Sequence, residues 1–363
     1  MSAGPQLMPR VLLSKAAQAP LSYSQEQMWA LYELDRDSVA YCCPAVHWLR
    51  GTLQASVLLA AVEQLASVQQ SLRTRYGYSL DGTAATQWVV PSEQWCVAVA
   101  SSSQPCVADA LQLLMHELGG SVMELEHEVL RLLMVGLDQG QLQLLVLNTH
   151  HIATDGVSHQ VQWQQLQQAY SGLIEGCKAP ALTQPLQYTE YAVWQRLWYG
   201  SAGRLEQQLQ WWKQALGDVP VLELQTDFAR PAVLGSAGGF VAVEIAAAEG
   251  LRGVWQSCLA TQMHGGLALW GLLLCQHSGQ GEVVIGTPFL NRGKAGLEGV
   301  IGYFVSTLGV LLQLEAAGGK PGDAGAGYKD VVYGASRAML GALEHGETPF
   351  VAVVQAVVEG RDS

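Results

Sequence analysis

The sequence predicts an α/β fold, because helical and strand patterns alternate along its 363 residues. Apolar residues make up 49% of the chain and charged residues only 14%, which excludes a disordered chain and provides ample material for buried cores. The formal net charge of −12 is opposite to what binding a nucleic-acid backbone requires. The longest apolar stretch, Gly265 to Cys275, is too short to cross a bilayer, so no membrane span is expected.

In the first two thirds of the chain, apolar residues recur with helical spacing in several segments. These segments predict helices at Ala55–Leu72, Val107–Leu118, Val157–Ile174 and Leu205–Leu216. The run QLQLLVLN, from Gln141 to Asn148, is continuously apolar at its centre and predicts a buried strand.

A linker over Thr226–Gly239 separates this part from a second set of elements, because it combines Pro231 with several Gly and Ala residues. Beyond it we expect helices at Glu249–Met263, Leu267–His277 and Tyr328–Leu343, strands at Glu282–Thr287 and Tyr303–Leu314, and a closing segment at Pro349–Val358. The glycines of 315–327 do not have the spacing of a dinucleotide-binding fingerprint, so this segment is predicted to be a surface loop.

The seven cysteines are scattered and include no Cys-x-x-Cys pair, and no secretory signal is visible. We therefore expect a reduced, intracellular chain in the cytoplasm. Residues 1–20 are predicted to be an unstructured N-terminal extension. Arg10, Lys15 and the absence of acidic residues there are also features of organelle transit peptides, which leaves import as an alternative.

One short segment carries the strongest indication of chemistry. Asn148 to Ser158 reads NTHHIATDGVS, which places two histidines after the predicted strand and an Asp-Gly pair at the start of the next helix. An imidazole titrates near neutral pH, so His151 could take a proton from an amine or hydroxyl nucleophile. The N–H groups near Gly156 could face an oxyanion that develops on a carbonyl.

Two other interpretations of this segment stay open from the residues alone. The histidines could be a buried pair, with Asp155 serving only as the helix N-cap. A zinc site is the third option, because His150, His151, Asp155 and His159 are close in sequence. No cysteine or second histidine cluster completes such a site.

The segment His150-His151-x-x-x-Asp155-Gly156-x-Ser158 resembles the HHxxxDG motif of nonribosomal peptide synthetase condensation domains, a motif shared across the chloramphenicol-acetyltransferase-like acyltransferase superfamily. Further segments resemble condensation-domain motifs in the family's order. They are Leu21–Leu34 (LSYSQEQMWALYEL), Tyr41–Pro44, Leu49–Gly51, Leu72–Thr74, Tyr188–Trp194 (YTEYAVW), Ile285–Arg292 (IGTPFLNR), Ile301–Thr307 (IGYFVST) and Pro349–Phe350.

This resemblance implies two chloramphenicol-acetyltransferase-like lobes, 21–175 and 176–363, each a mixed sheet covered by helices, arranged as a V around the motif. It also implies amide formation between two acyl or aminoacyl thioesters carried on phosphopantetheine arms. The expected partners are peptidyl or acyl carrier domains and an adjacent adenylation domain. No cofactor or metal of the chain's own is implied.

The resemblance also assigns roles to residues. His151 is the expected catalytic histidine, and Gly156 lets substrate approach the backbone. His150 is expected to be structural, while Asp155 pairs with Arg292 across the lobes and shapes the site. Ser158 and Ser306 are expected to line a substrate channel.

Some positions depart from the family pattern. Val68-Gln69-Gln70 stands in place of R-H-E, Ser306 in place of Asn and Leu311 in place of Arg. The chain stops where the family's domain continues, so an incomplete C-terminal lobe is expected. Two alternatives follow: an acyltransferase that uses acyl coenzyme A or a soluble acceptor, and a catalytically idle, truncated domain that only binds partners.

Overall fold

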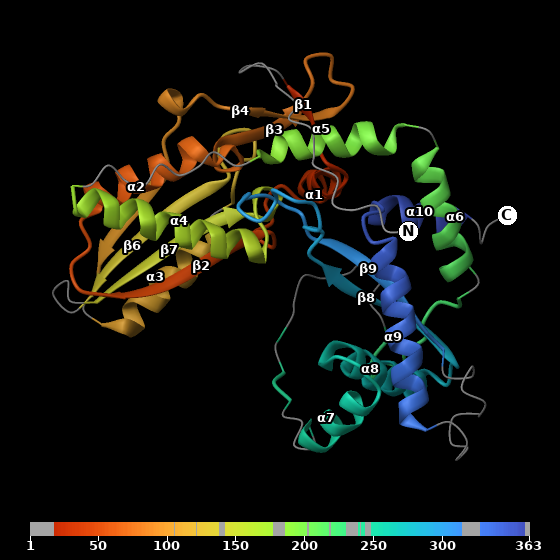
Figure 1. The fold of residues 1–363 in the computed structure, drawn as a ribbon. Coiled ribbons are helices and arrows are strands. Elements are labelled where there is room, and N and C mark those ends of the chain that lie inside the picture. The colour runs from red at the N-terminus through yellow and green to blue at the C-terminus, as the bar shows by residue number, and fades with distance from the viewer. Residues whose placement is uncertain are drawn as a thin grey trace. The chain divides into compact units, whose positions relative to one another are not determined.

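The computed structural model describes residues 18–104, 106–120, 122–137, 142–176, 186–201, 203–217, 219–229, 239, 241–243, 248–313 and 327–359. They fold into two compact units (Figure 1). The first unit runs to Arg204 and also contains Leu290–Val305, and the second contains Leu205–Phe289 and the residues from Ser306 onward. Each unit is described by itself below.

This division differs from the expected boundary at 175/176. Helix α5 (Tyr188–Tyr199) belongs to the first unit together with Leu290–Val305. The physical reason is a shared core cluster, in which Tyr188 and Tyr191 of the helix pack against Leu297, Val300 and Phe304.

The first unit contains two sheets. A four-stranded sheet has the order β2 (Cys42–Arg50), β7 (Leu142–His150), β6 (Leu130–Leu137) and β5 (Ala98–Ser103). Its β5–β6 pair is parallel and its other pairs are antiparallel, so the sheet is mixed as expected. A three-stranded sheet has the order β1 (Ala19–Pro20), β4 (Ala85–Val89) and β3 (Thr74–Tyr78).

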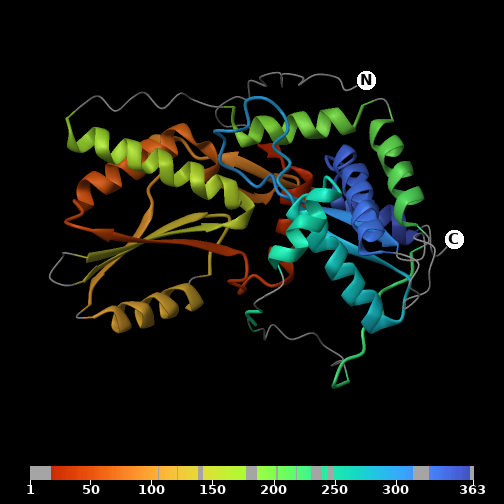
Figure 2. The same ribbon diagram turned by 60° about the horizontal axis from the view of Figure 1, so that its bottom comes forward.

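Helices cover both faces of the four-stranded sheet (Figures 1 and 2). Helices α2 (Ala55–Val68) and α4 (Gly156–Ile174) share one core cluster with Leu145 and Leu147 of β7. Helix α3 (Val107–Gly120) packs on the opposite face, against the alternate strand residues Leu144 and Val146. Helix α1 (Tyr23–Leu34) packs in a third cluster with Tyr76 of β3.

In the second unit, helices pack on the two-stranded antiparallel sheet of β8 (Glu282–Phe289) and β9 (Ser306–Gln313). The helices are α6 (Arg204–Leu216), α7 (Ala248–Ser257), α8 (Gln262–Ser278), α9 (Tyr328–Glu344) and α10 (Phe350–Glu359). One continuous core cluster joins them, with Trp212, Ala268, Val310 and Val332 all nearly inaccessible.

The predicted helix over Glu249–Met263 ends earlier than expected. Leu259 has a φ of 54°, and Thr261 caps a new helix by accepting a hydrogen bond from the His264 N–H. No single helix in the described part of the chain is long and apolar enough to cross a membrane; 250–257 and 262–278 meet that criterion only as a pair bent by 108°.

The predicted strand over Tyr303–Leu314 begins only at Ser306, because Tyr303 and Phe304 pack in the first unit. The other predicted helices and strands are present with ends shifted by a few residues. Most of the expected linker at 226–239, and the expected loop at 315–327 apart from Gly327, lie outside the described residues.

Candidate active site

The HHxxxDG segment forms a tight connection between β7 and α4 in the first unit. Strand β7 ends at His150, a single 3-10 turn follows over His151–Ala153, and α4 begins at Gly156. His150 is 3% exposed, and its Nδ1 accepts a hydrogen bond from the Ile152 N–H at 3.2 Å. Burial lowers the pKa of His150 to about 4, so the ring is neutral at pH 7 and shapes the turn. The structural role expected for His150 stays a prediction.

His151 is only half-buried, and its tautomer follows from one contact. Its Nδ1 lies 2.8 Å from the carbonyl oxygen of Thr154. A carbonyl oxygen can only accept, so Nδ1 carries the proton and Nε2 of the neutral ring is left with a free lone pair. The edge of the Tyr303 ring packs against this imidazole, with 4.7 Å between the ring centroids. The ring is therefore oriented from two sides, and its Nε2 makes no hydrogen bond within the described part of the chain.

Asp155 holds the start of α4 and the 290–305 segment together. Its Oδ1 accepts from the Ser158 N–H at 2.8 Å and from Arg292 Nη2 at 2.9 Å, while Oδ2 accepts from the Phe304 N–H at 3.1 Å. Both charged side chains are almost inaccessible, at 0% exposure for Asp155 and 8% for Arg292. The expected pairing is thus present, but as a contact within one unit, because Leu290–Val305 packs with the first unit.

Arg292 is satisfied on several sides. Its Nη1 donates to the carbonyls of Leu297 and Val300, each at 2.8 Å. Its Nη2 also donates to Ser158 Oγ at 2.6 Å, and its guanidinium lies 4.1 Å from the centroid of the Phe304 ring. The arginine therefore neutralises Asp155 and also fixes the loop that precedes Phe304.

Ser158 and Ser306 were both expected to line a substrate channel. Ser158 is fully buried, and its hydroxyl donates to the Gly302 carbonyl at 2.8 Å while accepting from the Gly302 N–H at 3.0 Å. These contacts place Ser158 in the support of the turn. Ser306 is the first residue of β9 in the second unit, half-buried, and its channel role stays a prediction.

No contact or backbone conformation within the described chain requires a glycine at position 156. It is exposed, its φ is not positive, and a Cβ added there would meet no atom within 4 Å. Among the residues that the structure describes, the N–H groups of Gly156 and Val157 have no acceptor, as expected at the first turn of a helix. Open space and two free donors thus lie directly after the histidine turn.

Two supporting residues were not predicted. Gln69, where the family has a charged motif, is 1% exposed, and its amide bonds Gln165 at 3.0 Å, the Gly299 carbonyl at 2.8 Å and the Ile301 N–H at 3.1 Å. Tyr188 donates to the Tyr303 carbonyl and bonds Ser22 Oγ at 2.8 Å. The Tyr188 position belongs to a recognised motif, which could have indicated it, whereas nothing around Gln69 did.

The zinc interpretation finds no further ligands. In the described ranges, no group of three or more His, Cys, Asp or Glu side chains is arranged to hold a metal ion. His159 lies on α4, and burial lowers the pKa of its imidazole. The carboxylate of Asp155 is already used by Arg292 and two backbone N–H groups.

Comparison with known proteins finds relatives that match most of the chain. Malpibaldin synthetase from Mortierella alpina is 30% identical over 374 residues, which cover 96% of this chain and 6% of that protein. Gramicidin S synthase 2 from Brevibacillus brevis is 30% identical over 293 residues, or 80% of this chain and 6% of that protein. The chain thus spans only a small fraction of the length of these curated relatives.

Solved structures show the same fold. The X-domain from teicoplanin biosynthesis superposes with a TM-score of 0.82 at 23% identity, over 96% of this chain and 75% of that chain. The first condensation domain of the calcium-dependent antibiotic synthetase gives a TM-score of 0.72 at 20% identity, over 91% of this chain and 75% of that chain. The family model described as "Condensation domain" matches residues 15–363. The chain belongs to the condensation domain family.

Proposed function

We propose that this chain joins two thioester-bound substrates of nonribosomal peptide synthesis through an amide bond. The α-amine of the acceptor attacks the acyl carbonyl of the donor, so that a C–N bond forms and the C–S bond breaks. The observation that carries this proposal is the orientation of His151, whose Nδ1 proton is held by the Thr154 carbonyl. Its Nε2 can then accept a hydrogen bond from the attacking amine.

In this mechanism His151 first orients the amine. A free amine is already nucleophilic, so positioning contributes before proton transfer does. As the C–N bond forms, Nε2 takes the ammonium proton and later supplies it to the departing thiolate. The free N–H groups of Gly156 and Val157 are suited to the oxyanion that develops on the donor carbonyl.

Asp155 and Arg292 act as support in this proposal, because every contact of the carboxylate is already made within the chain. The substrates would arrive on the phosphopantetheine arms of carrier domains, and an adenylation domain would load them, so the chain needs no cofactor of its own. The relatives named above are synthetases, and this supports such partners.

The test is a single-turnover reaction between an aminoacyl donor and an aminoacyl acceptor, each loaded on a separate carrier domain. His151→Ala should lower the rate of dipeptidyl-carrier formation about 10²–10⁴-fold, because one positioned acid/base group is removed. A matched control is His116→Ala, whose imidazole on α3 is 85% exposed. His116→Ala should react at the rate of the unaltered chain.

Two outcomes would decide against the proposal. If His151→Ala keeps the full rate, the assignment of His151 is wrong. If only acyl coenzyme A serves as donor and carrier-bound donors do not react, the chain is instead an acyltransferase that uses acyl coenzyme A. Circular dichroism of each variant shows that a lost rate is not a lost fold.

A further inference from the structure

The face of the four-stranded sheet that α3 covers carries a row of side chains that the proposed function does not use. Arg131 of β6 is paired with Asn148 of β7 on one side and with Ala98 of β5 on the other. Neighbouring strands lie about 4.8 Å apart, so these three residues are direct neighbours on the sheet. Two residues further along their strands, Leu133 and Val146 pack against α3. Residues two apart in a strand share a face, so the row also lies on the α3 side.

A pocket of about 190 Å³ opens over this row. Three polar side chains line it, one each from α3, β6 and β7: Glu117, Arg131 and Asn148. The β5 residues on this face, Ala98 and Ala100, also line the pocket. Because both are alanines, the space beside the last turns of α3 is left unfilled. The pocket therefore combines a small apolar wall with groups that can form hydrogen bonds.

Asn148 is the least expected of these polar residues. It is 4% exposed, and its Oδ1 is buried without a hydrogen-bond partner among the described residues. Buried amides are nearly always paired, and an unpaired one lowers stability. Asn148 is the first residue of the segment NTHHIATDGVS, yet neither the histidine turn nor its supporting contacts use its side chain. Its amide therefore has hydrogen-bonding capacity left for a molecule in the pocket.

The two charged residues of the pocket are neighbours that do not pair with each other. Arg131 donates through Nε to Glu128 and through Nη2 to the Val122 carbonyl, each at 2.7 Å. Its Nη1 has no partner in the part of the chain that the structure describes. The hydrogen bond with Glu128 is the main cause that raises the pKa of Arg131, and the nearby charge of Glu117 raises it further. The ion pairs of the described residues join Arg131 to Glu128 and Glu117 to the exposed His116, which leaves a gap between Arg131 and Glu117.

The volume of the pocket limits what can occupy this gap. An apolar cavity of about 150 Å³ holds one benzene molecule, so about 190 Å³ suits a molecule of roughly eight heavy atoms. A carboxylate and a guanidinium Nη1 that both have hydrogen-bonding capacity left call for a ligand with both signs of charge. An amine alone would leave the guanidinium without an acceptor, and a carboxylic acid alone would face the like charge of Glu117.

We propose that this pocket binds a free α-amino acid with a short aliphatic side chain, of about the size of valine. Its ammonium group donates to the Glu117 carboxylate and to Asn148 Oδ1, and its carboxylate accepts from Arg131 Nη1. Its side chain lies against Ala98 and Ala100 of β5. This binding site is separate from amide formation, because it lies on the sheet face opposite α4 and involves no residue of the histidine turn.

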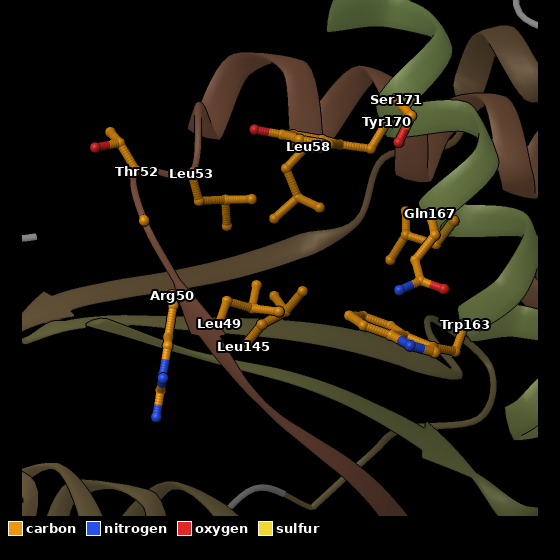
Figure 3. Close-up of a pocket in the computed structure, with 12 residues that line it drawn as sticks. Leu49, Arg50, Thr52, Leu53, Leu58, Leu145, Trp163, Gln167, Tyr170 and Ser171 are labelled. Carbon is orange, nitrogen blue, oxygen red and sulfur yellow. The ribbon is translucent and has the colours of Figure 1, made fainter. Parts of the chain in front are cut away.

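A second pocket, on the α4 side of the same sheet, provides a comparison. It has a volume of about 290 Å³ and is lined by several leucines and by Trp163 and Tyr170 (Figure 3). Figure 3 shows these leucines turned toward one another, whereas the Arg50 side chain points away from them. The Tyr170 hydroxyl already accepts from the Gln54 N–H at 3.0 Å. None of the described residues that line this pocket is acidic, so it offers no counter-charge to an ammonium group.

Calorimetric titration of the whole chain with L-valine tests the site directly. We expect one valine to bind per chain. Isobutylamine, which lacks the carboxylate, and 3-methylbutanoate, which lacks the ammonium group, should each bind at least tenfold more weakly, because each loses a charged hydrogen bond. Isobutylamine binding as tightly as valine would indicate a site for cations, and 3-methylbutanoate doing so would indicate a site for anions. Either result would overturn the proposal.

Variants then locate the bound amino acid. Glu117→Gln should weaken valine binding at least tenfold, whereas Glu63→Gln makes the same change at an exposed position of α2 and should not alter it. Ala100→Phe fills the pocket from the exposed strand β5 and should abolish binding. Its matched control is Ala84→Phe, at an exposed position outside the pocket. Asn148→Leu removes an unsatisfied amide, so its melting temperature should rise while valine binding weakens, and a purely structural residue would not separate these two quantities.

Leu53→Phe narrows the pocket on the α4 side and should leave valine binding unchanged. Absence of valine binding to the unaltered chain would overturn the inference. Equal binding by the unaltered chain, Glu117→Gln and Ala100→Phe would overturn it as well, and so would a loss of binding in Leu53→Phe alone. The titration uses no carrier domain and no thioester, so its result does not depend on whether the chain forms amide bonds.

Discussion

Replacing Arg292 by leucine tests how the histidine turn between β7 and α4 is supported. The change leaves the Asp155 carboxylate, whose side chain is 0% exposed, with two backbone N–H donors and no counter-charge. It also removes the donors to the carbonyls of Leu297 and Val300. Breaking one partner out of a buried ion pair costs about 3–5 kcal/mol, so we expect the free energy of unfolding to fall by about 4 kcal/mol.

The assay is urea denaturation followed by far-ultraviolet circular dichroism, with hydrogen exchange to show which peptides lose protection. In the double variant Asp155→Asn/Arg292→Leu the neutral amide needs no counter-charge. The double variant should therefore lose about as much free energy of unfolding as Arg292→Leu alone. This corresponds to a coupling energy of about 2–3 kcal/mol between the two substitutions. Costs that add within about 0.5 kcal/mol would show that the two side chains stabilise the turn independently, and the pairing argument would be wrong.

Three further predictions follow from single positions. Gly156→Ala should leave the melting temperature unchanged or slightly higher, since its Cβ would meet nothing within 4 Å. Single-turnover kinetics should nevertheless show a rate reduced at least tenfold, and an unchanged rate would mean that substrate does not approach this backbone. Gly302→Ala should instead cost about 1–3 kcal/mol in urea denaturation, because its Cβ would lie 1.9 Å from Cδ2 of the buried Tyr188, and a variant as stable as the unaltered chain would contradict that packing. His150 has a pKa of about 4 in the folded chain against about 6.5 when unfolded. Between these pH values the unfolded state therefore binds more protons than the folded state. As the pH falls from 6.5 to 4, the free energy of unfolding should drop by about 3 kcal/mol. Denaturation midpoints across that range, with His150→Asn as the variant that lacks this dependence, provide the measurement; identical pH profiles would refute the assignment.

Helices with a one-sided apolar stripe were predictable from the sequence, and α3 and α4 are examples. Strand β6 was not, because it is buried on both faces: Leu132 packs with α2 and α4, and Leu133 packs with α3. Such a strand has no alternation to detect. Helix α5 was not predicted as a helix, although its first residues were recognised as a motif, since its buried face carries Tyr188, Thr189 and Gln195 as well as apolar residues.

The turn that carries the histidine motif was predictable because its residues are neighbours in sequence. His151, Asp155 and Gly156 lie within six residues of one another, and the resemblance named Arg292 as the partner. The role of Gln69 was not predictable, because its hydrogen bond to the Ile301 N–H joins residues 232 positions apart. Burial of an amide with such distant partners leaves no local pattern in the sequence.

The return of Leu290–Val305 to the first unit has a consequence for folding during synthesis. Asp155 and Arg292 are 137 residues apart, and β8 of the second unit is made before Arg292 emerges. The nascent first unit therefore carries a buried carboxylate site without its cation until translation has passed residue 292. Loop closure over such a separation slows folding, so this turn should be among the last parts to become protected from solvent exchange. For the same reason, no single cut of the chain releases the first unit with its histidine turn intact, and recombination of such domains must carry 290–305 along with the histidine motif.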